Sequence, residues 1–381
     1  MMIPFFRPDI SPAERDRVDR VLQSGWLTSG NEAAAFEEEF AAYVGADHAV
    51  ALNSCTAALH LALLAHEIGP GDEVLVPTMT FAASAEVVLA VGAKPVLVDS
   101  DPDTLAISVA HARSKVTEKT KAVIVVHYGG AAGPLKEIMQ LADEVGAVVV
   151  EDAAHALPTT IDGQRVGSFS STACFSFYSN KTITTGEGGM LTTHDGEVAS
   201  KVRSLSLHGL SRDAWDRFRP GGSWEYDIRH PGWKYNFTDV AAALGRGQLE
   251  RCDDMAESRR ALSLRYDSAF AEESAIQPVD LGESSASAAH LYPIRIAHEQ
   301  LRIDRNELIV KINEAGVSTS VHYKPLHLHS LYSDTHQPSD LPVAFDQYSR
   351  LISLPLYPTM TEAEHDAVVS TVLSVVASNR G

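Results

Sequence analysis

Short apolar runs alternate with longer amphipathic stretches through the first half of the chain. The runs typical of strands cover residues 48–53, 72–77, 94–99, 121–127, 147–152 and 172–177. Helix-length stretches lie between them at 56–69, 81–92 and 135–146. Strands buried on both faces are near-continuous in Val, Ile and Leu, so the pattern predicts a mainly parallel sheet covered by helices. Sites in such α/β sheets lie at the carboxyl ends of the strands.

The second half of the chain changes pattern twice. Residues 198–272 are typical of helix, interrupted at 208–233 by a Gly-, Pro- and aromatic-rich stretch that we interpret as a long functional loop. A smaller α+β module follows, built from residues 290–296, 305–316, 317–323 and 361–379. We therefore predict a large domain over 1–250 and a small C-terminal α+β domain over 251–381.

Composition and charge narrow the function. The 381 residues carry 31 Lys and Arg against 50 Asp and Glu, a net charge of −19. Such a surface repels phosphate backbones and anionic lipid, so we expect neither a nucleic-acid partner nor a membrane partner. No apolar stretch approaches the ~18 residues of a membrane span, and the charged N-terminal segment is unlike a signal peptide. We expect a cytoplasmic protein.

Cysteines and histidines give no metal or disulfide signal. Cys55, Cys174 and Cys252 are odd in number and widely spaced, which supports neither a disulfide framework nor a zinc ribbon. His327 and His329 share one face of an extended segment, but no carboxylate or cysteine is spaced to complete a ligand set. We predict no metal site.

The common nucleotide-binding motifs are missing. The chain has no G-x-x-x-x-G-K-[ST] and no G-x-G-x-x-G between a strand and a helix. The glycines of 186–190 lead into a strand-like run and supply no helix N-terminus for a pyrophosphate. A dinucleotide-dependent dehydrogenase is disfavoured.

One strand end suits an anion. Asn53 closes the first strand, and Ser54, Cys55 and Thr56 open the next helix. Free N–H groups at a helix N-terminus attract an anion such as phosphate by roughly 1 kcal/mol per interaction. An ordinary N-cap is the alternative, and on this segment alone the more common one.

Two other strand ends carry ionisable groups. Glu151 and Asp152 end a strand too apolar to be exposed, so a carboxylate there needs a cationic partner, either a ligand or a structural salt bridge. Lys181 follows another buried strand and precedes a run of small residues and glycines. A desolvated lysine there becomes a nucleophilic amine, whereas a solvated loop lysine is the alternative.

A phosphate cup, a strand-end carboxylate and a lysine together match what pyridoxal phosphate requires. The cup anchors the phosphate, the carboxylate keeps the pyridine nitrogen protonated, and the lysine forms the Schiff base. Phe81 opens the helix after the second strand and could stack on the ring for about 1 kcal/mol. A core aromatic is its alternative role.

Long motifs in the same order resemble the nucleotide-sugar aminotransferases of the DegT type. The likeness runs through GWLTSG and the following helix at 25–63, then 69–99, VVEDAAHA, SFYSNKTITTGEGGM, KYNFTDVAAALG and VHYKPLHLH. The resemblance implies an α/β, aspartate-aminotransferase-like architecture (fold type I). This has a mainly parallel seven-stranded sheet in the large domain and a smaller α+β C-terminal domain.

The resemblance also implies roles for residues at matching positions. Lys181 would be the Schiff-base lysine and proton shuttle, Asp152 the partner of the pyridinium nitrogen, and His155 the residue beside the cofactor's 3-hydroxyl. The remaining cofactor contacts would come from Ser54, Cys55, Thr56 and Ser176 at the phosphate, Phe81 on the ring, and Asn236 reaching the phosphate from the neighbouring subunit. A shared site of this kind implies a homodimer or a larger assembly.

Departures from the family pattern are few. Many members have glycine in place of Cys55. The family usually has the sequence Y-G-x-x after the predicted strand, whereas residues 127–130 of this chain are His-Tyr-Gly-Gly. A dehydratase branch replaces the Schiff-base lysine by histidine, whereas this chain keeps Lys181. Because a lysine can carry the proton and re-form the cofactor linkage, transamination is favoured.

The motifs NKTITTGEGGM and WKYNFTD resemble members that aminate C4 of a nucleotide-linked 4-keto-6-deoxy sugar. L-glutamate would convert the cofactor to pyridoxamine phosphate, which then aminates the sugar. Candidate substrate contacts are Thr28, Lys234, Arg229, His322 and His327, with surface salt bridges the alternative for Arg229. Amination at C3, amination of a non-nucleotide cyclic ketone, dehydration, or a non-catalytic pyridoxal-phosphate-binding regulator remain the alternatives.

Overall fold

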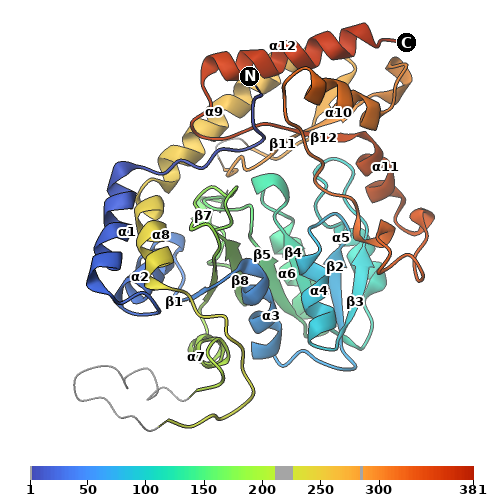
Figure 1. The fold of residues 1–381 in the computed structure, drawn as a ribbon. Coiled ribbons are helices and arrows are strands. Elements are labelled where there is room, and N and C mark those ends of the chain that lie inside the picture. The colour runs from blue at the N-terminus through green and yellow to red at the C-terminus, as the bar shows by residue number, and fades with distance from the viewer. Residues whose placement is uncertain (1, 211–225, 284–285) are drawn as a thin grey trace.

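A seven-stranded sheet forms the centre of the computed structural model, which describes residues 2–210, 226–283 and 286–381 (Figure 1). The strand order is β1-β9-β8-β5-β4-β2-β3. β9 is antiparallel to both neighbours and every other pair is parallel, as predicted. The strands are β1 (His48–Leu52), β2 (Glu73–Pro77), β3 (Lys94–Val98), β4 (Thr120–Val126), β5 (Val148–Asp152), β8 (Thr172–Ser176) and β9 (Gly189–Thr193).

Alternation along the strands places helices on both faces. Val74 and Val76 of β2 join one apolar cluster with α3 and α4, whereas Leu75 between them joins another with α5 and α6. Successive side chains of a strand point to opposite faces, so a strand apolar throughout needs cover on both. The covering helices are α3 (Cys55–Ala65), α4 (Ala83–Ala90), α5 (Val109–Lys115), α6 (Leu135–Val145) and α7 (Gly196–Leu205).

Three further helices close the β1 end of the sheet. α1 (Pro12–Ser24) begins at a capping box in which Ser11 and Glu14 satisfy each other's backbone N–H groups. α2 (Asn31–Val44) and α8 (Asp239–Glu250) pack together over β1. Phe36 and Phe40 of α2 make tilted and edge-on ring contacts with Phe175 and Phe177, which fixes α2 to the end of β8.

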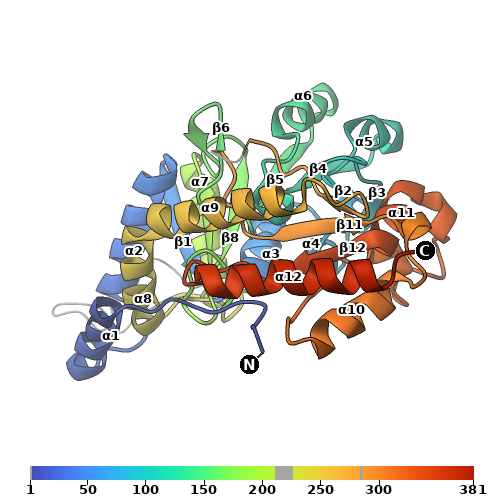
Figure 2. The same cartoon turned by 90° about the horizontal axis from the view of Figure 1, so that it is seen from above.

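The C-terminal part forms a smaller α+β unit above the sheet (Figure 1). Its antiparallel sheet has the order β10 (Ile276–Pro278), β11 (Tyr292–Ile296) and β12 (Leu351–Leu354). Seen from above, β11 lies between α9 and α12 (Figure 2). The helices of this unit are α9 (Cys252–Phe270), α10 (Arg305–Glu314), α11 (Pro342–Arg350) and α12 (Glu362–Ser378).

Residues 317–323 of the predicted α+β module form no regular strand, although they alternate between apolar and polar side chains. They make only isolated bridges, Ile3 to Val317 and Ser320 to Ser353. The Thr319 N–H donates to Asn313 Oδ1 at 3.0 Å instead of to a neighbouring strand. A side-chain acceptor competes with the strand ladder, and the segment turns toward the main sheet.

Within the described residues, the remaining short elements are a two-stranded hairpin and four single-turn 3₁₀ helices. The hairpin is β6 (Thr160–Ile161) with β7 (Gln164–Arg165), and the turns cover Tyr128–Gly130, His298–Gln300, Leu326–Leu328 and Pro338–Asp340.

The N-terminal segment joins the two units. Ile3 bridges Val317, and the segment runs beside α12 before reaching α1 (Figure 2). The division at residues 250 and 251 falls between α8 and α9 and stays a prediction. Residues 211–225 of the predicted functional loop lie outside the described residues.

Candidate active site

The carboxyl edge of the sheet brings the predicted cofactor residues together. β1, β5 and β8 run in the same direction and end at Leu52, Asp152 and Ser176, so Ser54 and Lys181 in the loops that follow lie at that edge. Chain topology thus joins residues that are more than a hundred positions apart in sequence.

Lys181 lies in the loop between β8 and β9, with its backbone N–H donated to Tyr178 O at 3.0 Å. Burial lowers the pKa of its amine to about 8, opposed by the negative charge of Asp152. The free amine therefore forms at far lower pH than in a solvated lysine. The alternative of a solvated loop lysine does not describe this position.

Glycine allows the strand after Lys181 to approach the turn at Ser54, Cys55 and Thr56, the predicted anion site. A Cβ on Gly189 would lie 2.4 Å from the carbonyl carbon of Ser54 and 2.5 Å from the Cys55 nitrogen. Any side chain would push β9 away from the turn. The glycine run of the sequence thus serves close backbone packing beside the lysine.

The turn after β1 forms the cup. Ser54 is the N-cap of α3, and its Oγ accepts the N–H of Ala57 at 3.0 Å. The first-turn N–H groups at Cys55 and Thr56 have no acceptor within the helix and remain available to an anion. The N-cap and the anion site, offered above as alternatives, are compatible in this geometry.

Cys55 contributes its backbone rather than its thiol. The thiol points into the core and donates to Cys174 O at 3.4 Å. Burial raises its pKa well above the ordinary value, so it stays neutral and non-nucleophilic. A buried side chain here explains why a residue other than glycine fits the cup.

Asp152 is 6% exposed and holds both carboxylate oxygens in hydrogen bonds. Ser84 Oγ donates to Oδ2 at 2.7 Å, and the Ala154 N–H donates to Oδ1 at 3.2 Å. The sequence did not predict this role for Ser84. The residue lies in a predicted helix 68 residues before Asp152, and no motif links the two. No structural salt bridge to Asp152 is among the ion pairs of the described residues.

His155 forms a directed contact with a second residue that the sequence did not reveal. Its Nδ1 accepts the Gly129 N–H at 3.3 Å, so the ring proton is on Nε2 and is donated to the Tyr323 hydroxyl at 3.0 Å. Burial, followed by the charge of Lys181, lowers the pKa of His155 well below its ordinary value and keeps it neutral. The Tyr323 proton then remains available to a further acceptor.

The small unit closes over this edge. The ring of His290, which precedes β11, lies 4.3 Å from that of His155. Arg259 of α9 is buried, and burial lowers its pKa to about 10. Both side chains add to the electrostatics near Lys181, and neither was visible from sequence spacing.

Phe81 and Ser176 lie at the same edge. The Phe81 ring is 60% exposed and 6.2 Å from that of Tyr323, so it is not the core aromatic of its alternative role. Ser176 ends β8, and its hydroxyl accepts the Tyr178 N–H at 3.3 Å. Both positions are compatible with a bound ring and phosphate.

The residues of the KYNFTD motif have two kinds of contact, packing and capping contacts in the fold and hydrogen bonds near the surface. Phe237 packs on Phe36 in the core, Thr238 caps α8, and Asp239 accepts the N–H of Ala33 at 3.0 Å. Asn236 Nδ2 donates to Ser29 Oγ at 2.8 Å, and Lys234 donates to Asn236 Oδ1.

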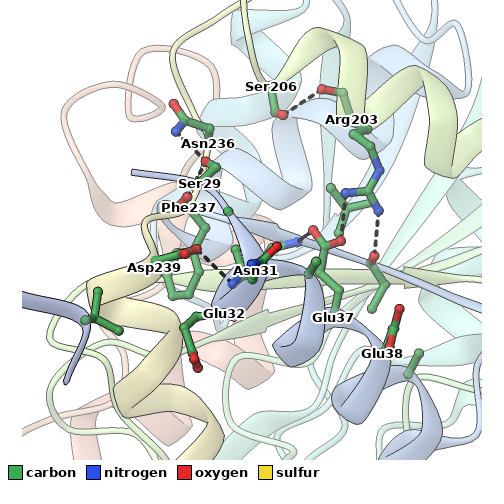
Figure 3. Close-up of a pocket in the computed structure, with 18 of the residues that line it drawn as sticks. Ser29, Asn31, Glu32, Glu37, Glu38, Arg203, Ser206, Asn236, Phe237 and Asp239 are labelled. Carbon is green, nitrogen blue, oxygen red and sulfur yellow. Dashed lines mark hydrogen bonds and ion pairs between the residues drawn. The ribbon is translucent and has the colours of Figure 1, made fainter. Parts of the chain in front are cut away.

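Asn236, Ser206 and Arg203 line a groove of about 1050 Å³ (Figure 3). Glu37 also lines it, accepting from Arg203 at 2.7 Å. Lys181 and Asp152 are not among the groove's lining residues.

Three of the five predicted substrate contacts lie near the KYNFTD motif or near Lys181. Thr28 lies beside the motif, its carbonyl accepting the Asp239 N–H at 3.2 Å. His322 lies near Lys181, with its pKa lowered to about 4 by burial and its Nδ1 paired with Ser353 Oγ at 2.9 Å. These two and Lys234 stay candidates.

The other two candidates lie apart. His327 is buried, and its Nδ1 pairs with Thr78 Oγ1 at 2.9 Å, which favours an anchoring role for the turn after β2. Arg229 is exposed. Its backbone N–H donates to Gly209 O at 3.0 Å. Across the described ranges, no cluster of three or more His, Cys, Asp or Glu side chains is arranged to hold a metal.

The residues present fit pyridoxal phosphate. The helix N-terminus at Ser54 suits the phosphate, the paired Asp152 suits a protonated ring nitrogen, and the buried Lys181 amine suits a carbonyl carbon. When bound, this cofactor supplies an electron sink for amino-group transfer. The fold and this edge define an aspartate-aminotransferase-like enzyme.

Comparison with known proteins agrees with this class. The model of the DegT/DnrJ/EryC1/StrS aminotransferase family matches residues 8–373. The chain is 43% identical over 377 residues to the spore coat polysaccharide biosynthesis protein SpsC of Bacillus subtilis, covering 98% of this chain and 97% of SpsC. The chain belongs to the DegT/DnrJ/EryC1/StrS aminotransferase family.

Solved structures show the same relation. The PLP form of the candidate sugar aminotransferase Spr1654 from Streptococcus pneumoniae superposes with a TM-score of 0.92 at 36% identity, covering 99% of both chains. Helicobacter pylori PseC, an aminotransferase involved in the biosynthesis of pseudoaminic acid, gives a TM-score of 0.92 at 26% identity, covering 99% of this chain and all of PseC. The protein is therefore a sugar aminotransferase that uses pyridoxal phosphate, as predicted. The helices of the described residues include none with the length and hydropathy of a membrane span.

Proposed function

We propose that this enzyme transfers the amino group of L-glutamate to C4 of a nucleotide-linked 4-keto-6-deoxy sugar, giving a 4-amino-4,6-dideoxy sugar nucleotide. The observation that carries the proposal is the buried Lys181 amine, whose pKa is about 8, beside the Asp152 carboxylate and the Ser54 turn. Sugar-related relatives support the substrate class. The position of amination rests on the motif resemblance.

In this proposal each residue has one task. The first-turn N–H groups after Ser54, with Ser176, bind the phosphate, and Phe81 lies on the ring. Asp152 would keep the ring nitrogen protonated, His155 would orient the 3-hydroxyl, and Lys181 would bind the cofactor and carry the proton between the substrate carbon and C4′ of the cofactor.

We also propose a homodimer with shared sites, in which Asn236 reaches the phosphate of the partner subunit. Trp26, which lines the groove with Asn236, and the adjoining Leu27 expose large apolar side chains. Apolar surface concentrated near a site is typical of an interface.

The test of the reaction begins with absorption spectra of the protein loaded with pyridoxal phosphate, before and after L-glutamate. Loss of the visible band and growth of the near-ultraviolet pyridoxamine band is expected. Keto sugar nucleotides differing in base and keto position are then added, and the new C–N bond is assigned by NMR. Amination at C3, loss of water without nitrogen gain, or glutamate turnover with no keto sugar accepted would each contradict the C4 proposal.

A further inference from the structure

A chain of buried hydroxyls ends on the Asp152 carboxylate. Ser84 Oγ lies 2.7 Å from Asp152 Oδ2, and Thr80 Oγ1 lies 2.8 Å from Ser84 Oγ. Ser84 is fully buried and Thr80 is 2% exposed. Water therefore does not compete for these contacts.

Proton counting gives the chain a single direction. A carboxylate can only accept, so the one hydroxyl proton of Ser84 is donated to Asp152. The contact between Ser84 and Thr80 then requires the Thr80 proton. Thr80 donates to Ser84 and Ser84 donates to Asp152, and successive donors strengthen one another in a buried site.

The local fold leaves the Ser84 hydroxyl free for this task. Ser84 lies in the first turn of α4, where a serine commonly bonds to its own backbone. Here the N-cap position is Ala82, without a side-chain cap, and Ser84 bonds side chains on both sides instead. The arrangement connects the start of α4 to the end of β5.

Lys181 is the one titratable neighbour of Asp152, among Lys181, Cys55 and Cys174, that can carry a positive charge. The thiols of Cys55 and Cys174 face Asp152, and burial raises the pKa of both well above the ordinary value, so they stay neutral. The hydroxyl and amide donors thus carry much of the stabilisation of the carboxylate.

We propose that Ser84, supported by Thr80, is a positioning residue that keeps the shared proton on the ring nitrogen of pyridoxal phosphate rather than on Asp152. A donated hydrogen bond favours the charged carboxylate over the neutral acid, and a charged carboxylate pairs with a protonated ring nitrogen. Fixing Oδ2 also turns the carboxylate in one direction. The inference rests on the proposed role of Asp152 opposite that nitrogen.

The test uses the holoenzyme loaded with pyridoxal phosphate labelled with ¹⁵N in the ring. Ser84→Ala is expected to move the ¹⁵N signal from the protonated toward the unprotonated position, and Thr80→Val to move it less. Thr80→Ser, which keeps the hydroxyl, is expected to restore the native signal. Thr172→Val is the matched control, because Thr172 is equally buried but pairs with His66.

Affinity gives a second readout. Ser84→Ala is expected to weaken pyridoxal phosphate binding about tenfold, the effect of losing a hydrogen bond to a charged group. Binding of 1-deazapyridoxal phosphate, which has C–H in place of the ring nitrogen, is expected to stay unchanged. A merely structural role for Ser84 would weaken both ligands equally.

Unchanged ¹⁵N signals in both Ser84→Ala and Thr80→Val would overturn the inference, as would equal losses for the two ligands. Thr80→Val keeps the test decisive if Ser84→Ala does not fold. Failure of the proposed function is a separate result: the unaltered protein would then aminate no 4-keto sugar nucleotide at C4, whatever the ¹⁵N signals of the variants.

Discussion

Lys181 is half-buried, and its amine loses hydration, which favours the neutral form. Its sequence neighbours are small and polar, so the sequence alone left a solvated loop lysine open. Burial lowers its pKa to about 8 from the ordinary value of 10.5. The reactivity of this residue comes from its surroundings.

The rate of cofactor attachment should follow the free amine. Below pH 8 Lys181 is protonated and does not attack a carbonyl, so the rate of appearance of the visible band should rise with pH and reach half its maximum near pH 8. At neutral pH an ordinary lysine would have roughly a hundredth of this free fraction or less. A half-maximum near 10.5 would contradict the lowering of the Lys181 pKa by burial. Lys181→Ala is the control and should retain no cofactor after borohydride.

Asp152→Asn should lower turnover by about a hundredfold or more, because an amide cannot stabilise a protonated ring nitrogen electrostatically. Some cofactor should stay bound, since the Ser54 turn and Lys181 are unchanged. Steady-state kinetics and absorbance of the purified variant provide the check. Near-normal turnover would remove Asp152 from its proposed role.

Strand ends β4 and β5 are joined behind the site by a second buried network. His127 Nδ1 accepts the Gly133 N–H at 3.0 Å, so Nε2 donates to Glu151 Oε2 at 2.8 Å. Ser170 Oγ donates to the other oxygen at 2.6 Å. Glu151 points to the face of β5 opposite to Asp152. Alternation along the strand predicts opposite faces for these two acids, but the sequence could not predict the role of each.

Removing one partner of this network should destabilise the protein. His127→Leu leaves the Glu151 carboxylate short of a donor in a fully buried position, at a cost of about 3 kcal/mol in the free energy of unfolding. Urea titration followed by circular dichroism measures it. Arg113→Ala, which breaks the exposed pair with Glu144, is the control and should change stability little. Equal effects from the two variants would count against the importance of the buried network.

At the scale of the whole molecule, the sheet edge, the small unit and the N-terminal segment enclose one site. Figure 1 shows the small unit above the sheet, and the His155 and His290 rings, one from each part, lie 4.3 Å apart. Lys181 does not line the Asn236 groove, and Asn236 bridges Leu52 at the end of β1.

Shared sites predict complementation between two inactive variants. Lys181→Ala and Asn236→Ala, each tested alone, should have little activity. Coexpression with different tags should give mixed dimers in which about half of the sites contain both native residues and are active. Activity measured after tandem affinity purification is the check. No recovery in the mixed dimer would place Asn236 in the site of its own chain.

The sequence by itself determined the parallel sheet and the cofactor class. Continuous apolar strands and helix-length spacers are local patterns, and the strand direction follows from the spacers. Topology alone then places Ser54, Asp152 and Lys181 at one edge. These predictions needed no knowledge of side-chain contacts, and the family relation and the cofactor are confirmed, whereas the individual roles stay predictions.

Only the tertiary structure decided which side chains tune that edge. Ser84, Tyr323 and Arg259 come from three distant segments, and no periodicity links them to Asp152, His155 or Lys181. Residues 317–323 alternate like a strand, yet a side-chain acceptor and the turn toward the site prevent regular pairing. Hydrophobic periodicity reports which face of an element is buried, whereas burial of a titratable group and the direction of a hydrogen bond depend on atoms brought together by the whole fold.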